Sequence, residues 1–296
     1  MAKVALVTGA STGIGRQIAG LLANSGCRVF GTSRSPQGER LDNFEMLPLD
    51  VTSDDSVRAC LAALLERAGR LDVLVNNAGV ELLGGAEEIG VDEAKWIFET
   101  NFFGVMRVTS AALPVMRAQQ SGCIINISSL AGVGGAPFQG LYVASKHALE
   151  GYTESLRYEV KPFGVRVALV EPGFFRSEIG SRKRLPASPI PAYDRARERV
   201  LQRWQALYEA GPDPAPVAQT VLAIADGRSA RFRHFIGPET FMAEWKYIVP
   251  DWLVEQRMRW MFGLDDLLMD TLRLVPLLGT ALLIGVAALA RLGSRR

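Results

Sequence analysis

The 296-residue sequence has few of the residues that build metal centres and disulfide frameworks. Its two histidines, His147 and His234, each stand without a cysteine, an aspartate or a second histidine at metal-ligand spacing. Its three cysteines, Cys27, Cys60 and Cys123, are odd in number, far apart and set in apolar runs. This pattern predicts small buried thiols in a reducing compartment, and it gives no reason to expect a metal site.

The chain also has little net charge. The formal net charge is +2, and no run of lysine and arginine interleaved with aromatic residues occurs in the body of the chain, so no nucleic-acid partner is expected. Hydrophobic residues make up 48% of the chain and charged residues 22%, which favours a buried core over disorder. A strand-like run already begins at Lys3 and leaves no room for an apolar export leader, so we expect a cytoplasmic location.

A long uncharged apolar run occurs near the C-terminal end. The stretch from Leu274 to Ala290 would rise about 25 Å as a helix, close to the short limit for a ~30 Å hydrocarbon core. Tryptophan and tyrosine residues upstream of it alternate with basic residues, as at a membrane interface. We expect an amphipathic helical extension over residues 241–270 and a hydrophobic tail over residues 271–296 that contacts a membrane from its cytoplasmic side. A helix buried against a partner subunit, or one that covers the substrate cleft, fits the same pattern.

The rest of the chain alternates between two periodicities. Short β-branched runs predict buried parallel strands; they begin at Val4, Arg28, Leu71, Cys123 and Val165. Helical stretches lie between them, such as the one that is capped by Ser53 or Asp54 and closed by Gly69. Because parallel neighbours need crossover connections, residues 1–240 are predicted to form one Rossmann-type, doubly wound α/β domain with helices on both faces of its sheet. Residues 176–216, rich in proline, arginine and alanine, are expected to form a substrate lid around one helix.

The stretch "TGASTGIG", Thr8 to Gly15, follows the first predicted strand and opens the first predicted helix. Gly9 permits a tight turn, Gly13 lets a phosphate approach the backbone, and Gly15 lets helix and strand pack closely. The free N–H groups at the helix start would then face a pyrophosphate. In this strand–turn–helix context the motif predicts a dinucleotide site. The residues expected to form it are Gly9, Ser11, Thr12, Gly13, Ile14 and Gly15.

The spacing G-x-x-x-G-x-G resembles that of the short-chain dehydrogenase/reductase family, and the resemblance extends from Lys3 to Pro238. The stretch "PFQGLYVASKHALEGYTESLRYEVKPFGV" is similar to the hydroxysteroid and retinol dehydrogenase branch of that family. The resemblance implies an oxidoreductase that acts on a CH–OH group with a nicotinamide dinucleotide. It also implies further cofactor-binding residues, namely Asp50, Val51, Asn76, Ala78, Gly79, Tyr142, Lys146, Pro172, Gly173, Phe175 and Ser177.

The second predicted strand ends without the carboxylate that would bind the ribose diol of NAD. Ser33 stands at that position and Arg34 follows it. A guanidinium can pair with phosphate oxygens, so we expect NADP(H) to be favoured over NAD(H). An ordinary solvated arginine would give the same sequence, and Thr12 stands where some NADP-preferring relatives carry a second basic residue.

Tyr142 and Lys146 are four residues apart and share a face of a predicted helix. A nearby ammonium and an oxidised nicotinamide ring both stabilise a phenolate, so this pair predicts a tyrosine whose pKa lies below the usual ~10. The resemblance implies that Tyr142 is the general acid/base and that Lys146 holds the nicotinamide ribose. It implies that Ser129, at a strand end, orients the substrate oxygen, while Ser128 alternates to the opposite face. It also implies that Asn101 links the lysine to water; a polar residue inside a helix is the plainer interpretation.

Apolar residues near several strand ends predict a pocket for a lipophilic substrate, although each of them could equally be core. Those expected in the pocket are Leu82, Val133, Phe138 and Phe174. We therefore expect interconversion of a lipophilic alcohol with its ketone or aldehyde, the alternative being reduction of a ketone lipid intermediate. A dinucleotide-sensing binding module without catalysis, or a membrane-tethered scaffold, is the alternative of another class. Relatives often pair through two long helices, so a homodimer or homotetramer is expected.

Overall fold

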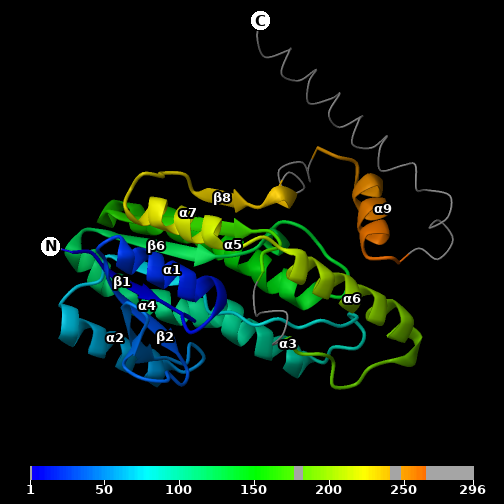
Figure 1. The fold of residues 1–296 in the computed structure, drawn as a ribbon, viewed down its shortest axis with the longest axis horizontal. Coiled ribbons are helices and arrows are strands. Elements are labelled where there is room, and N and C mark those ends of the chain that lie inside the picture. Colours follow the sequence, from blue (N-terminus) through cyan, green and yellow to red (C-terminus); the bar gives the residue numbers. More distant parts are fainter. Residues whose placement is uncertain (1, 177–182, 241–247, 265–296) are drawn as a thin grey trace, which may run out of the picture.

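The computed structural model describes residues 2–176, 183–240 and 248–264, and within them eight strands form one sheet (Figure 1). The strands are β1 (Val4–Val7), β2 (Arg28–Ser33), β3 (Arg40–Leu41), β4 (Phe44–Pro48), β5 (Val73–Asn76), β6 (Gly122–Ile127), β7 (Val165–Pro172) and β8 (Arg233–Ile236). Their order across the sheet is β3-β4-β2-β1-β5-β6-β7-β8, and all neighbours run parallel except β3 and β4. The direction of winding reverses between β1 and β5, which is where a doubly wound sheet opens a crevice for ligands.

Helices cover both faces of this sheet (Figure 1). On one face lie α1 (Gly13–Asn24) and α7 (Ala215–Ala225). On the other lie α2 (Asp54–Ala68), α4 (Gly104–Gln119) and α5 (Gly140–Val160). The other longer described helices are α3 (Val91–Phe98), α6 (Asp194–Ala210) and α9 (Asp251–Met261). Short helical segments are η1 (Glu99–Phe103), η2 (Leu130–Gly132), η3 (Lys161–Phe163), η5 (Pro191–Tyr193) and η6 (Pro238–Thr240).

The first strand shows why these residues form a sheet with two buried faces. Val4 and Leu6 pack in the core beneath α2, α4 and α5, whereas Ala5 and Val7 pack in the core beneath α1 and α7. Successive strand side chains point to opposite faces, so a strand covered on both sides must be apolar throughout. The predicted doubly wound parallel fold is confirmed.

The predicted elements are present, and the structure adds three strands that the sequence did not indicate. Of the two proposed caps for α2, Ser53 is the N-cap and accepts a hydrogen bond from the backbone N–H of Ser56, and Gly69 ends the helix at φ 69°. The unexpected strands are β3, β4 and β8. They are short and carry charged residues or proline, so neither a β-branched run nor a clear alternation marks them.

Two helices extend beyond the sheet at the same end of the molecule (Figure 1). Helix α6 lies within the predicted lid, and α9 is the described part of the predicted extension over residues 241–270. They pack together through Trp204 and Phe262, whose ring centroids are 4.7 Å apart. Trp252 and Trp260 on α9 are exposed. No helix among the described residues combines the length and apolarity needed to cross a membrane, and the predicted tail over residues 271–296 lies outside the described residues.

Candidate active site

The turn between β1 and α1 is held rigidly against the loop after β5. Gly9 has φ +66°, and a Cβ on Gly15 would stand 2.3 Å from the carbonyl oxygen of Gly9 and 2.4 Å from Nδ2 of Asn77. Glycine is therefore required where α1 approaches the turn. Thr8 Oγ1 accepts hydrogen bonds from the backbone N–H groups of Asn77 and Ala78 at 2.9 and 3.0 Å, which joins the two loops.

The start of α1 offers an open backbone surface of the kind that a phosphate needs. Gly13 has φ +55°, and no described atom lies within 4 Å of the place a Cβ would occupy. Thr12 is the N-cap, yet its side chain makes no capping hydrogen bond to the described start of the helix. Ser11 precedes it in the turn, and Ile14 lines the adjacent cavity. These features fit a dinucleotide pyrophosphate bound at a helix N-terminus.

The ends of β2 and β4 bring together the residues predicted to meet the adenosine half of the cofactor. Ser33 Oγ is buried and has no hydrogen-bond partner among the described residues. Asp50 Oδ1 accepts from the N–H and hydroxyl of Thr52 at 2.9 and 2.8 Å. Burial raises the pKa of Asp50, but these hydrogen bonds and the positive charges of Arg34 and a second arginine outweigh it, so the pKa is lowered. Val51 is buried beside them. An unsatisfied hydroxyl followed by an arginine fits a polar cofactor group at this edge.

One predicted cofactor residue is placed differently from the expectation. Asn76 Nδ2 donates to Asn126 Oδ1 of β6 at 2.8 Å and to Thr109 Oγ1 of α4 at 3.1 Å, and the side chain is buried between these elements. The cavity is lined instead by Asn77 and Gly79. Asn76 is the last residue of β5, and its inward direction follows from strand alternation. Its side chain thus contacts β6 and α4, and its role in binding the cofactor ribose stays a prediction.

The three predicted catalytic side chains converge at the carboxyl end of β6. Ser129, Tyr142 and Lys146 line one cavity, and the Ser129 side chain is close enough to Tyr142 to act on its pKa. Lys146 Nζ donates to the carbonyl oxygen of Ile127 at 2.9 Å and lies 5.9 Å from the centre of the Tyr142 ring. Tyr142 and Lys146 are only 9% and 6% exposed, so their charges are poorly screened by water.

The ionisation of this pair differs from the expectation. Burial and the carboxylate of Glu81 raise the pKa of Tyr142 well above its usual value, and the hydrogen bond from Ser129 opposes them. Burial lowers the pKa of Lys146 to about 8, and the negative charge of Glu150 opposes that shift. We expected a pKa below the usual value for Tyr142, but the groups of the protein raise it. The physical reason is that removing a phenolate from water is costly. Tyr142 therefore holds its proton at neutral pH.

Asn101 lies in the π-helical segment η1 and is buried behind the catalytic pair. Its Oδ1 accepts from the backbone N–H of Val80 at 2.8 Å, and its Nδ2 donates to the carbonyl oxygen of Val80 at 2.9 Å and to Ser145 Oγ at 3.2 Å. These contacts fasten the loop after β5 to helix α5. The proposed link between the lysine and water stays a prediction.

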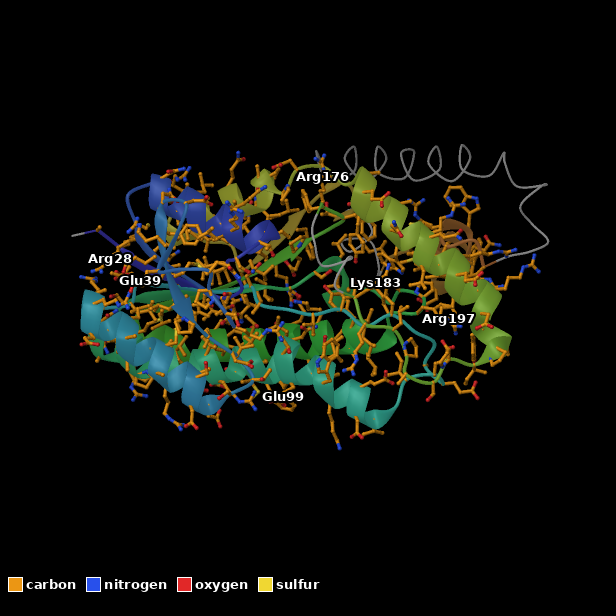
Figure 2. All side chains as sticks on the ribbon, turned by 60° about the horizontal axis from the view of Figure 1, so that its bottom comes forward. Arg28, Glu39, Glu99, Arg176, Lys183 and Arg197 are labelled. Atoms are coloured by element: carbon orange, nitrogen blue, oxygen red, sulfur yellow. The ribbon has the colours of Figure 1, made fainter. Side chains whose placement is uncertain are left out.

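A buried acid that the sequence did not single out lies in the loop after β5. Glu81 is 1% exposed, and its Oε1 accepts from Gln139 Nε2 at 2.6 Å and from the hydroxyl of Tyr208 at 2.7 Å. Burial raises the pKa of Glu81, against these hydrogen bonds and the positive charge of Lys183, which lies beside α6 (Figure 2). In the sequence, the only signal of burial for Glu81 was its position as a single acid within the apolar run "GVELLGG".

A second set of buried acids, Glu150 and Glu171, lies near Lys146. Arg233 of β8 forms ion pairs with Glu150 and Glu171, the latter with Arg233 Nη1 2.8 Å from its Oε1. Glu171 Oε2 also accepts from the N–H of His234 at 3.0 Å. Ser128 Oγ and Glu150 Oε1 both lie close to Gly132, so Ser128 points away from the hydrogen bond that Ser129 makes.

The cavity around Tyr142 has an apolar wall that comes largely from outside the sheet. The residues that line it include Val133, Pro172, Gly173, Phe174, Phe175, Trp204, Tyr208, Val254, Met258, Met261 and Phe262. Val133 and Phe174 are thus where the pocket prediction placed them. Leu82 and Phe138 are not among the described lining residues, and their contact with a substrate stays a prediction. Leu82 is fully buried against Ile97 and Tyr142, and Phe138 packs edge-on against Tyr193. Ser177 lies outside the described residues.

Helix α6 is tied to the loop that follows β5. Arg197, labelled on α6 in Figure 2, pairs with the buried carboxylate of Glu88 and with Asp194. Tyr208, near the other end of the helix, donates to Glu81. The wall that α6 contributes to the cavity is therefore fixed to the loop behind Tyr142 at two points.

Comparison with known proteins identifies close sequence relatives. A family model described as short chain dehydrogenase matches residues 3–187. The 3-ketodihydrosphingosine reductase of Bacteroides thetaiotaomicron is 37% identical over 261 residues, which cover 87% of this chain and 97% of that protein. Retinol dehydrogenase 8 of Bos taurus is 38% identical over 184 residues, which cover 58% of each chain.

Solved structures share the same architecture. A short-chain dehydrogenase from Streptomyces avermitilis superposes with a TM-score of 0.75 at 35% identity, covering 88% of this chain and 96% of the other. A short-chain dehydrogenase/reductase from Burkholderia phymatum in complex with NAD gives 0.74 at 27% identity, with 86% and 95% covered. A metagenomic short-chain oxidoreductase in complex with NADP gives 0.63 at 30% identity, with 79% and 96% covered.

Proposed function

Because this chain belongs to the short-chain dehydrogenase/reductase family and is an NAD(P)-dependent oxidoreductase of CH–OH groups, we propose that it reduces a lipophilic ketone with NADPH. The observation that carries this proposal is the cavity itself. Its catalytic floor, Ser129, Tyr142 and Lys146, is covered by apolar side chains from α6 and α9. Such a cavity excludes water from a carbonyl and accepts a long or bulky apolar chain.

The residues of the chain supply orientation and proton transfer, and the reduced nicotinamide of the bound cofactor supplies hydride. Ser129 holds the substrate oxygen beside Tyr142. The hydroxyl of Tyr142 transfers its proton to that oxygen as negative charge develops there. Lys146, held by the Ile127 carbonyl, then keeps a positive charge close to the phenolate that remains.

The names of the relatives and the extent of their alignment favour a ketone lipid as substrate. The relative named 3-ketodihydrosphingosine reductase aligns over nearly its whole length, including the region of α6 that builds the cavity wall. The relative named retinol dehydrogenase 8 aligns over little more than half of its length. We therefore place reduction of a long-chain ketone ahead of oxidation of a steroid or retinoid alcohol.

The direct test is a panel of a long-chain 3-ketone, a steroid ketone and retinal, each assayed with NADPH and with NADH. The highest kcat/KM is expected for the long-chain ketone with NADPH. Turnover confined to the steroid or to retinal would contradict the substrate class. Dinucleotide binding without turnover of any carbonyl would contradict the proposed reduction and favour a dinucleotide-sensing module.

Cofactor preference is proposed to depend on Arg34, the cation at the end of β2. Replacing Arg34 by serine removes charge-assisted hydrogen bonds to a 2′-phosphate, so kcat/KM for NADPH should fall by roughly 10- to 100-fold and that for NADH should stay within about twofold. Arg40→Ser, on β3, the next strand along the chain, is the matched control and should change neither value. An equal loss for both cofactors after Arg34→Ser would show that the arginine does not read the phosphate.

A further inference from the structure

We propose that Glu81, Gln139 and Tyr208 form a recognition site for an ammonium group carried by the substrate close to its carbonyl. The inference deepens the proposed reduction of a lipophilic ketone and rests on it. It defines the substrate class more narrowly, as a long-chain amino ketone.

The three side chains are brought together from separate parts of the chain. Glu81 follows β5, Gln139 immediately precedes α5, and Tyr208 lies on α6. Both partners donate to the same carboxylate oxygen, at 2.6 and 2.7 Å. Glu81 Oε2 is buried and has no hydrogen-bond partner among the described residues. Burying a carboxylate with one unpaired oxygen costs free energy of folding, and a cation bound nearby would offset part of that cost.

The hydrogen bonds fix the polarity of this part of the cavity wall. Tyr208 has given its only hydroxyl proton to Glu81, so its oxygen can offer the substrate only lone pairs. Gln139 donates its amide Nε2 to Glu81, which leaves its carbonyl oxygen as an acceptor. Both residues line the cavity, and the charge of Glu81 stands behind them. The wall thus favours a donor with positive charge and disfavours a carboxylate or phosphate.

This acceptor wall lies next to the catalytic phenol. Gln139, Tyr142 and Tyr208 line the same cavity, and Gln139 is one helical turn before Tyr142. The charge of Glu81 acts on both tyrosines, raising the pKa of each. If a ketone binds with its oxygen at Tyr142, a group one or two carbon atoms from the carbonyl carbon would therefore lie at the wall formed by Gln139 and Tyr208. Apart from the catalytic residues, this wall, Asn77, Ser128 and Glu239, the lining residues are apolar, which suits the remaining chain.

The test compares two substrates that differ only in this group: a long-chain 2-amino-3-ketone and the same 3-ketone without the amine. The wild-type enzyme with NADPH should show a kcat/KM roughly 10- to 100-fold higher for the amino ketone, the range of a charge-assisted hydrogen bond. Glu81→Gln should bring the two values to within about threefold of each other, chiefly by slowing the amino ketone. Glu87→Gln, a neighbouring acid that accepts from Tyr193 outside the cavity, is the control and should keep the full preference.

Each other outcome has a defined meaning. Equal kcat/KM values for the two ketones in the wild type would overturn the inference and leave the proposed reduction standing. An equal loss for both ketones in Glu81→Gln would also overturn it, because the acid would then only support the fold. Reduction of neither ketone would refute the proposed function itself. If Glu81→Gln fails to fold, Tyr208→Phe decides the matter, since it removes one acceptor while the bond between Glu81 and Gln139 remains; an unchanged preference there would count against the site.

Discussion

Tyr142→Phe is expected to lower the single-turnover rate of carbonyl reduction by roughly 10²- to 10⁴-fold, the range for loss of a positioned general acid. The substitution removes the hydroxyl that we propose as the proton donor while preserving the ring that packs against Leu82. The rate is measured by stopped-flow oxidation of NADPH with the enzyme in excess. NADPH affinity, measured by fluorescence titration, should change less than threefold.

A matched control for this experiment lies ten residues along the same helix. Tyr152 packs edge-on against Phe102 and does not line the described cavity, so Tyr152→Phe should leave the rate within about twofold. If Tyr142→Phe reduced ketones at the wild-type rate with NADPH bound, the phenol would not be the proton donor. Ser129 and Lys146 would then need different roles.

The substitution Arg233→Met is expected to destabilise the fold by about 3 kcal/mol, the cost of removing one partner of a buried ion pair. Arg233 is the shared cation of Glu150 and Glu171, whose side chains are 7% and 0% exposed. Without it, two carboxylates remain buried beside β7. The free energy of unfolding is measured by urea titration at pH 7. Arg228→Met removes a largely exposed pair with Asp226 and should cost at most about 1 kcal/mol.

The pH dependence of the Arg233→Met variant provides an independent check. Burial already raises the pKa of Glu150 and Glu171 in the folded protein, and Arg233 opposes that rise. Loss of the arginine should raise both pKa values further. A raised folded-state pKa stabilises the fold below the unfolded-state value and loses that contribution as pH rises through the folded-state value. The deficit against wild type should therefore be smaller near pH 5 than at pH 8; a deficit independent of pH would show that lost packing is its cause.

Local sequence patterns were sufficient for the parts of the molecule whose structure is local. The glycine turn requires particular backbone angles and close approaches within a few residues, and its motif predicts them. Strand β1 is buried on both faces and apolar throughout, and β7 contains the apolar run "VALV", so both could be located directly. Tyr142 and Lys146 share a helix face because of their spacing alone. These features do not depend on what distant segments do.

The remaining parts depend on contacts between distant segments. Glu81 and Tyr208 are 127 positions apart, so nothing near Glu81 shows that its charge is buried and partnered. The predicted direction of the Tyr142 pKa shift was wrong because burial and the charge of Glu81 both depend on tertiary packing, which the local sequence does not show. Leu82 and Phe138 carry the same apolar character as Val133 and Phe174. Only the packing of α3 and the segment before α6 decides which of them faces the cavity.

The contact between Trp204 and Phe262 builds part of the cavity wall outside the sheet. The side chains proposed for proton exchange are anchored near the carboxyl end of β6, whereas these two aromatic residues belong to α6 and to the position that follows α9. An evolving lineage could exchange those aromatic residues and admit new molecules while its reactive centre stayed intact. The same separation gives protein engineers a short list of positions at which to begin.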